Sequence, residues 1–427
     1  METTYRRFIR IYSLGLIWVA ILLGAVPFAA IAADTIKIGV LEALSGPQEY
    51  TGRFWLAGLQ FAIDEQNAKG GLFGKKIEYI SEDSEWKADV ANRKARKLIM
   101  EDQVDILASA GASAVSIALN KVATSYKKLF ILYGANADDL MGREFSRYAF
   151  RVAQNSHNIY TALALSMANK PYRRFYVMTP DNVVGYSFSK TFKEQIKIHV
   201  PDAKIVGEDN PPLFTVKDFG PYITKIIAAK ADAVTLGLFG PDLINMIKQS
   251  RAMGLKAPFP FLTHIAEPYP MNELKDDGVG LYSAGAYSLN VKTPENQEMI
   301  KKYHEKHKND KDFLTWWPFG YLGQGIIGWR MTFAAIEKAG SLDPEKVIEA
   351  FEGFQYKSAV GLWTMRKCDH QVILPMYSGV TVAGWNAFYN GSIRPDVKLP
   401  WEGPNIEMFP AEKVALPATS GYNPRCP

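Results

Sequence analysis

Short apolar runs rich in β-branched residues alternate along the chain with segments whose apolar residues recur every three or four positions. The first run, residues 35–41, is typical of a buried strand. Leu56, Leu59 and Ile63 then define the apolar face of a helix that ends near Asn67. This alternation is typical of βαβ units around a mostly parallel sheet, so we expect an α/β fold.

The alternation runs through two similar rounds. In the first round we expect further strands at residues 77–80, 104–107 and 129–133, and helices at residues 87–101 and 113–126. In the second round we expect strands at residues 175–178, 205–206, 233–238 and 258–262, and helices at residues 187–199, 219–229 and 241–253. Two α/β lobes in series are the simplest interpretation, because the chain is long enough for two hydrophobic cores.

The rest of the sequence has too few strands for a third domain. We expect a strand near residues 282–286, helices at residues 294–307, 318–338 and 344–351, and late strands at residues 361–365 and 376–382 near the second lobe. The predicted organisation is residues 34–153 plus 287–358 for lobe 1, residues 154–286 plus 359–385 for lobe 2, and a Pro-rich C-terminal tail at residues 386–427 without regular structure. Several crossings between the lobes predict a hinge and a cleft.

Residues 1–33 have the pattern of a secretory signal peptide. Three arginines precede an apolar run from residue 11 to residue 26, and small residues end the segment at Ala33. A retained membrane anchor is the alternative, although the run is short for a bilayer-spanning helix. No cysteine near Ala33 offers a lipid attachment site. We therefore expect a free protein of the Gram-negative periplasm.

The formal charge of +5 on 427 residues is spread without long basic blocks. Nothing in this pattern favours binding to nucleic acid or to a membrane surface. The composition, 48% hydrophobic and 12% aromatic, is that of a globular protein able to bury two cores.

Cys368 and Cys426 are the only cysteines of the chain. In an oxidising compartment, two cysteines predict one disulfide, which here would fix the Pro-rich tail. A metal site of Cys368 with His370 is the alternative, but further ligands are missing nearby.

Gly323, Gly325 and Gly328 match the spacing of a dinucleotide-binding loop, but the preceding residues 315–318 do not form a strand pattern. Close packing of another element against a helix is the better interpretation of these glycines. Six scattered histidines, none beside an obvious nucleophile, indicate neither a catalytic triad nor a metal site. We expect no enzymatic activity and no cofactor.

Short polar and aromatic turns follow the predicted strands. These turns contain Ser45, residues 111–113, residues 134–136, Tyr186, Phe239 and His264. In open α/β folds, ligands bind at the edge where the carboxyl ends of parallel strands meet. Small residues bring backbone amides and hydroxyls close to a solute, and aromatic residues form walls. Each turn alone is an ordinary loop, but together they predict a binding cleft.

The order and spacing of several segments resemble the extracytoplasmic solute-binding proteins of ABC importers, of the branched-chain amino acid (Leu/Ile/Val-binding) type. The resemblance is carried by IKIGVLEALSGPQEYTG, GLQFAIDEQNAKGGLFGKKIEYISED, SAGASAVSIAL, FRVAQNSHNIYTALAL, MIKQSRAMGL and GLWTMRKCDHQV, which together span nearly the whole chain after residue 35. It implies a type I periplasmic binding fold, in which two Rossmann-like lobes close on a ligand and present it to a membrane permease.

The resemblance also implies which residues hold the ligand. A serine and backbone amides after the third strand, and a turn after the fourth, hold the carboxylate in the amino-acid binders; the matching positions are Ala112, Ser113, Ala135 and Asn136. The tyrosine and glutamate that address the ammonium group fall near Phe239 and His264, which differ from the family pattern. Further wall and turn candidates are Ser45, Tyr50, Tyr186 and Trp317.

An ammonium ion buried without a carboxylate partner is costly, so these departures weaken the interpretation as an α-amino acid binder. We expect a small organic acid, amide or aromatic carboxylate as the ligand, with a branched-chain amino acid as the next choice. The predicted function is transport, as a monomer working with ABC permease subunits. A sensor of the same fold that signals to a membrane receptor is the alternative.

Overall fold

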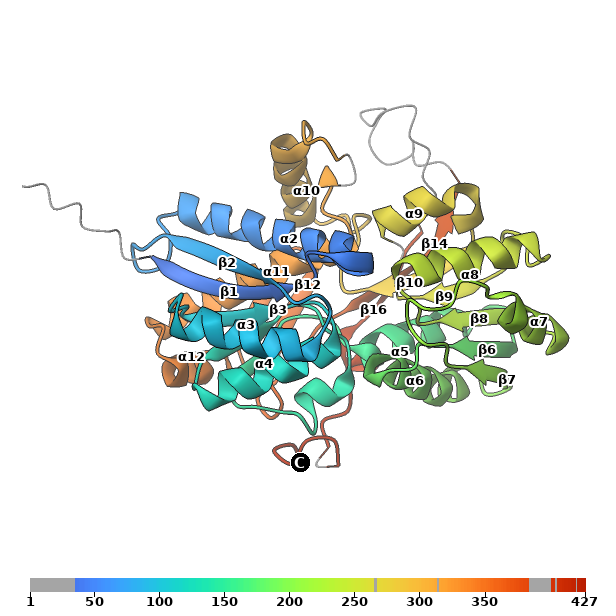
Figure 1. Cartoon of the computed structure of the whole chain (residues 1–427), viewed down its shortest axis with the longest axis horizontal. Coiled ribbons are helices and arrows are strands. Elements are labelled where there is room, and N and C mark those ends of the chain that lie inside the picture. The colour runs from blue at the N-terminus through green and yellow to red at the C-terminus, as the bar shows by residue number, and fades with distance from the viewer. Residues whose placement is uncertain (1–34, 265–266, 313–314, 384–400, 404, 420) are drawn as a thin grey trace, which may run out of the picture. The chain divides into compact units, whose positions relative to one another are not determined.

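The computed structural model describes residues 35–427 except residues 265–266, 313–314, 384–400, 404 and 420 (Figure 1). The predicted signal peptide, residues 1–33, lies outside the described residues. No helix among the described residues is long and apolar enough to cross a membrane.

Sheet I is a five-stranded parallel sheet with the strand order β2-β1-β3-β4-β5. Its strands are β1 (Ile36–Glu42), β2 (Ile77–Asp83), β3 (Ile106–Ser109), β4 (Leu129–Leu132) and β5 (Ala149–Arg151). The connecting helices are α2 (Glu49–Ala68), α3 (Ala88–Met100) and α4 (Ser113–Ser125). Every residue of β3, β4 and β5 is buried, as expected for a parallel sheet covered on both faces.

Sheet II has eight strands in the order β15-β14-β10-β9-β8-β6-β7, and β16 also pairs with β14. The strands are β6 (Arg174–Met178), β7 (Lys204–Asp209), β8 (Ala233–Leu236), β9 (Phe261–Thr263), β10 (Leu281–Gly285), β14 (Met376–Val382), β15 (Trp401–Glu402) and β16 (Glu407–Phe409). The helices α5 (Ser156–Met167), α6 (Val183–His199), α7 (Gly220–Ala228), α8 (Gly240–Ala252) and α9 (Pro268–Leu274) accompany it (Figure 1). The strands from β7 to β10 are parallel, and β14 joins β10 antiparallel.

After β10 the chain returns to sheet I. The helices α10 (Pro294–His307), α11 (Gly320–Ala339) and α12 (Pro344–Phe351) follow, and α11 packs on α2. A Cβ atom on Gly58 of α2 would lie 2.8 Å from the carbonyl oxygen of Leu322, so only glycine permits this approach. A Cβ on Gly328 would likewise lie 2.7 Å from the carbonyl oxygen of Val152. The packing interpretation of the glycines in α11 is therefore confirmed.

The structure corrects two expectations about the strands. Residues 361–365 do not join sheet II: β12 (Gly361–Met365) lies between β11 (Gln355–Ser358) and β13 (Val372–Ile373) in a separate antiparallel sheet, where Trp363 and Met365 are buried. β5 and α5 were not predicted from the sequence pattern. All residues of α5 except Leu165 are buried, so the helix has no polar stripe to mark its period.

The C-terminal tail contains regular structure despite its prolines, which corrects a further expectation. β15 and β16 pair with β14, and the short helix α13 (Ala411–Val414) packs on α5. The tail ends beside sheet I, where Tyr422 donates a hydrogen bond to the carbonyl oxygen of Asp138 (2.7 Å). Cys368 and Cys426 form a disulfide, as predicted, so their sulfur atoms are not available as metal ligands.

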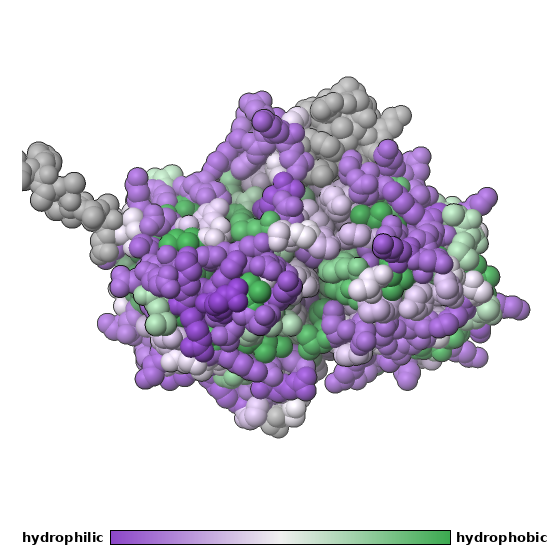
Figure 2. Space-filling view, in the orientation of Figure 1, coloured by the Kyte–Doolittle hydropathy of each residue, from purple (hydrophilic) through white to green (hydrophobic). Residues whose placement is uncertain are grey.

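The surface of the described residues is predominantly hydrophilic in the view of Figure 2. Large apolar side chains that reach the surface, such as Phe73, Met100 and Ile198, come from separate segments of the chain. Isolated exposed apolar residues are normal for a globular protein.

Candidate functional site

Two adjoining cavities lie where the strands of sheet I end. The first, which we call the sheet-edge compartment, has a volume of about 40 Å³ and is lined by Gln48, Thr51, Trp55, Trp86, residues 110–113, Ala135, Asn136, Val184, Phe239 and Tyr321. The second, the crossover compartment, also has a volume of about 40 Å³ and is lined by Gln154, His264, Glu267, residues 283–289, Gly320, Tyr321 and Gln324. Tyr321 lines both, so the two compartments meet at its side chain.

The sheet-edge compartment is rich in hydrogen-bond donors. The helix α4 begins at Ser113, and its first turn opens onto the compartment. Val184 and Phe239, at the starts of α6 and α8, line it from the side of sheet II. Helix N-termini carry unpaired N–H groups and a partial positive charge. The Asn182 side chain already caps the start of α6 by accepting from the backbone N–H of Gly185 (2.9 Å), whereas the start of α4 has no side-chain cap and so favours a bound anion.

Ser113 fixes the turn after β4 as well as lining the compartment. Its Oγ accepts a hydrogen bond from the backbone N–H of Ala137 (3.2 Å), which leaves the hydroxyl proton available to a ligand. The buried guanidinium of Arg151 holds the same turn from behind, by donating to the carbonyl oxygens of Ala135 (3.0 Å) and Ala137 (2.7 Å). Ala135 has φ 59°, so this turn adopts a left-handed conformation that needs such support.

Glu42, the last residue of β1, supports the neighbouring turn. Its Oε1 is 2.6 Å from the backbone N of Ala110 and 2.8 Å from the hydroxyl oxygen of Tyr133. Burial raises the pKa of Glu42 to about 8, because water no longer stabilises the charged form. At neutral pH this carboxyl group is therefore mostly uncharged, and it adds little negative charge near the sheet-edge compartment.

Aromatic side chains form the walls of the sheet-edge compartment. Trp55 of α2 stacks on Tyr321 of α11, with ring centroids 4.9 Å apart and 24° between the ring planes. Phe239 closes the side of sheet II. Such walls suit a flat or apolar ligand body.

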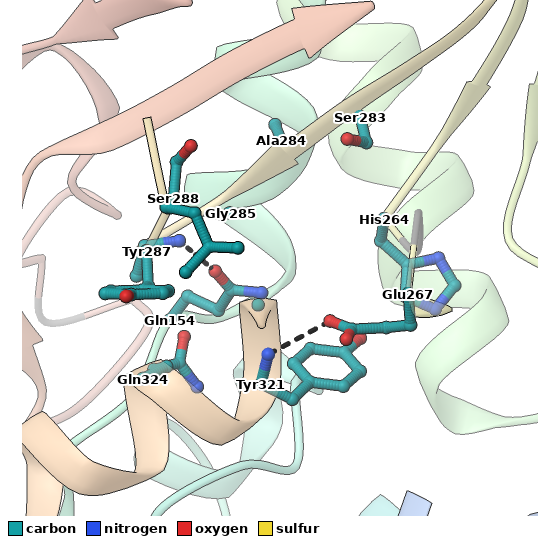
Figure 3. Close-up of a pocket in the computed structure, with 13 residues that line it drawn as sticks. Gln154, His264, Glu267, Ser283, Ala284, Gly285, Tyr287, Ser288, Tyr321 and Gln324 are labelled. Atoms are coloured by element: carbon teal, nitrogen blue, oxygen red, sulfur yellow. Dashed lines mark hydrogen bonds between the residues drawn. The ribbon is translucent and has the colours of Figure 1, made fainter. Parts of the chain in front are cut away.

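The crossover compartment lies at the segments where the chain passes between the two sheets, after β5 and after β10 (Figure 3). Gln154 accepts a hydrogen bond at Oε1 from the backbone N–H of Ala286 (2.6 Å), which joins these two segments. Glu267 accepts one at Oε1 from the backbone N–H of Tyr321 (3.0 Å), at the start of α11. Gln324 lies one turn further along α11.

His264 lies at the rim of the crossover compartment, packed among aromatic rings. Its ring centroid is 4.7 Å from those of Phe188 and Phe239, and its Nδ1 is 3.5 Å from the hydroxyl of Tyr160. Burial lowers the pKa of His264 to about 3, so the ring is neutral at physiological pH.

Most of the residues predicted as ligand contacts lie together. Ala112, Ser113, Ala135, Asn136 and Phe239 line the sheet-edge compartment, and His264 lines the crossover compartment. Tyr50 is buried next to them and stacks on Tyr269.

Like Tyr50, three other candidates line neither compartment. Ser45 donates to Asp83 Oδ2 (2.5 Å), and Tyr186 is 52% exposed and bonded to Asp181. Trp317 stacks on His304, with ring centroids 3.6 Å apart.

The sequence pattern did not indicate Gln154, Glu267, Tyr321 or Gln324 as site residues. Glu267 lies only three residues beyond His264 in the sequence. Its carboxylate, so close to the end of a predicted strand, was the one feature that could have indicated a site residue there. Tyr321 and Gln324 lie between and beside the glycines of α11, which already indicated close packing at this point.

The profile of the periplasmic binding protein family matches residues 35–384. The chain belongs to this family. A Leu/Ile/Val-binding protein homolog 4 of Brucella abortus (strain 2308) is 26% identical over 367 residues, which cover 82% of this chain and 84% of that protein. The predicted family, of the branched-chain amino acid type, is thus confirmed.

Solved structures of similar proteins share the fold. The Leucine-, isoleucine-, valine-, threonine-, and alanine-binding protein from Brucella ovis, in its closed conformation, has a TM-score of 0.77 at 22% identity, covering 90% of this chain and 97% of that chain. A solute binding protein of an ABC transporter from Rhodopseudomonas palustris HaA2, in complex with p-hydroxybenzoic acid, has a TM-score of 0.76 at 20% identity, covering 88% and 98%. The type I periplasmic binding fold is therefore confirmed for this periplasmic binding protein.

The relatives found are named as binding proteins and not as enzymes. This agrees with the prediction of a solute-binding protein, and the alternative of a sensor is not favoured.

Proposed function

We propose that this periplasmic binding protein captures a small organic carboxylate between sheets I and II and delivers it to the permease subunits of an ABC importer. The residues that we assign to the carboxylate are Ala112, Ser113, Ala135 and Asn136, which line one compartment. Phe239 and Tyr50 serve as walls and His264 as a contact from the side of sheet II. Ser45 and Tyr186 have the weakest support, because both are exposed and neither lines a compartment, whereas Tyr50 is buried.

One observation carries this proposal: the start of α4, which has no side-chain cap, lines the sheet-edge compartment through Ala112 and Ser113. The lining of this compartment includes no acidic side chain among the described residues. Donors without nearby negative charge stabilise a carboxylate and reject a cation. Ligand affinity would come from these hydrogen bonds together with apolar burial against Trp55 and Tyr321.

The remaining predictions about the protein follow from this role. We propose that residues 34–153 plus 287–358 and residues 154–286 plus 359–385 move as two lobes around the crossing segments. The protein would act as a periplasmic monomer, after removal of a signal peptide, without catalysis and without a cofactor. A hinge of this kind closes on the ligand and presents the closed form to the permease.

A thermal-shift screen tests the proposal. Protein stripped of ligand by unfolding and refolding is mixed with amino acids, aliphatic amides, dicarboxylates and aromatic carboxylates. A solute present at a hundredfold excess over Kd, and bound only by the folded state, stabilises that state by about 2.7 kcal/mol, which raises the melting temperature visibly. A rise with carboxylates, and none with their methyl esters, is the expected result. A rise only with uncharged solutes would contradict it.

A further inference from the structure

The crossover compartment offers hydrogen-bonding groups that the protein itself does not use. Gln324 is 2% exposed, and its Oε1 has no hydrogen-bond partner among the described residues. Its Nε2 is 3.4 Å from the carbonyl oxygen of Tyr133, which orients the amide. A buried acceptor without a partner costs free energy unless a ligand or water satisfies it.

Gln154 faces the same compartment from the segment after β5. It is also 2% exposed, and its Oε1 is occupied by the backbone N–H of Ala286. Only its amide N–H groups remain to donate to a solute. Gln154 and Gln324 thus provide a donor and an acceptor in one buried compartment.

Glu267 adds negative charge to this compartment. Its carboxylate accepts from the backbone N–H of Tyr321, and it is the only acidic side chain that lines either compartment among the described residues. Burial, and then the charge of Glu267, hold the pKa of Tyr321 well above its usual range, which is consistent with the close approach of the two side chains. The crossover compartment is therefore richer in acceptors, whereas the sheet-edge compartment is richer in donors.

An α-amino acid fits this division poorly. Its ammonium group is attached to the carbon next to the carboxylate, so its two charges lie close together, whereas the donor-rich lining and Glu267 belong to different compartments. In the sheet-edge compartment the carboxylate finds donors, but the ammonium finds no acidic partner among the described lining residues. The acidic partner, Glu267, lies in the other compartment, beyond the shared residue Tyr321.

We propose that the ligand is a carboxylic acid whose second polar group is a hydrogen-bond donor at the far end of the molecule, and that Gln324, Gln154 and Glu267 select it. This inference rests on the proposed capture of a carboxylate in the sheet-edge compartment. An aromatic acid with a para hydroxyl or amino group, or an aliphatic acid with a terminal amino or amide group, has this form. The aromatic walls at Trp55 and Tyr321 lie beside the path between the two groups.

Positional isomers test the inference, because they differ only in where the donor is placed. Calorimetric titration compares 4-hydroxybenzoate with 2-hydroxybenzoate and with benzoate, and 6-aminohexanoate with its isomer leucine. In at least one of the two series, the isomer with the distant donor should bind at least about tenfold more tightly than the isomer with the adjacent donor. Tighter or equal binding of leucine and of 2-hydroxybenzoate would overturn the inference but leave carboxylate capture intact. Failure of every carboxylate to bind would overturn the proposed function itself.

Variants of single residues test whether the preference for the isomer with the distant donor arises in the crossover compartment. Gln324→Leu should lower the affinity for the favoured isomer by about tenfold and bring the ratio between isomers towards one. Gln60→Leu, on α2, is the matched control, because its amide bonds only Asp64 (2.8 Å) and lines neither compartment. Ser113→Ala should weaken both isomers and preserve their ratio. An unchanged ratio in folded Gln324→Leu protein would overturn the assignment; the comparison of isomers in the unaltered protein remains decisive if that variant fails to fold.

Discussion

Tyr50, at the start of α2, stacks on Tyr269 of α9, with ring centroids 4.3 Å apart and 23° between the ring planes. The first residue belongs to a helix beside sheet I and the second to a helix that accompanies sheet II. Asp138 and Ser187 make a second contact of this kind, since the Ser187 hydroxyl donates to Asp138 Oδ2 (3.0 Å). The proposed hinge motion would break the contacts that join the two sheets when the cleft opens, so these contacts should control how long a ligand remains bound.

The Tyr269→Ala variant tests this control. A stacked aromatic pair contributes roughly 0.5–1.5 kcal/mol beyond its buried area, so its loss should speed ligand dissociation by about two- to tenfold. Stopped-flow release of the ligand identified in the screen measures the rate. Tyr222→Ala on α7 is the control, because the ring of Tyr222 contacts Phe219 and Lys225 of the same segment. Equal dissociation rates in the two variants would contradict the role of the stack.

Ser113 should be the strongest single determinant of carboxylate affinity. A hydrogen bond to a charged group contributes about 1.5–3 kcal/mol, so Ser113→Ala should weaken binding roughly ten- to a hundredfold by calorimetry. The matched control is Ser125→Ala, because Ser125 ends the same helix, is exposed, and bonds only the carbonyl oxygen of Lys121. If both variants bind equally well, the carboxylate lies elsewhere.

Glu42 predicts a dependence of stability on pH. Its pKa is raised from 4.5 to about 8 by burial, so the folded state holds this proton more tightly than the unfolded state does. The associated stability is present in full below pH 4.5, and it is lost as the pH rises through 8. Relative to Glu42→Gln, the unaltered protein should therefore lose on the order of a few kcal/mol of unfolding free energy between pH 5 and pH 9. Urea unfolding across this range measures the difference, and parallel pH profiles of the two proteins would refute it.

The sequence predicted the fold well because the fold depends on local periodicity. The helices α2, α3, α4 and α8 lie where their apolar spacing places them. Short elements were harder to predict: β5 has three residues and ends in the buried Arg151, whose charge is typical of a surface. The pairing of β12 with β11 was missed as well, because pairing depends on tertiary contacts and not on the pattern of one strand.

The candidate site was predictable in part, for a similar reason. Ala112, Ser113, Ala135 and Asn136 follow parallel strands, and topology alone brings such turns to one edge. Gln154 and Gln324 enter the site from a crossing segment and from a returning helix, at positions that no strand pattern indicates. Gln324 reaches the site because α11 packs on α2. The glycines of α11 are the only sign of this packing in the sequence.

The disulfide between Cys368 and Cys426 fixes the end of the C-terminal tail. The segment from β16 to Cys426, which we call the strap, runs from sheet II back to sheet I. β16 pairs with β14, Asn158 of α5 donates to the carbonyl oxygen of Val414 (2.8 Å), and Asn423 donates to the carbonyl oxygen of Met141 (2.9 Å). The strap therefore holds segments that belong to both halves of the chain.

Reduction of this disulfide should destabilise the protein. For a sequence separation of 58 residues, the lost restriction of the unfolded chain corresponds to about 4 kcal/mol. Urea unfolding with and without dithiothreitol measures this loss, and a Cys368→Ser, Cys426→Ser double variant should be as unstable as the reduced protein and indifferent to the reductant. Because Tyr422 of the strap bonds Asp138, which in turn bonds Ser187, reduction should also speed ligand release. Two free thiols by titration, with unchanged stability, would show that the remaining hydrogen bonds hold the strap without the covalent bridge.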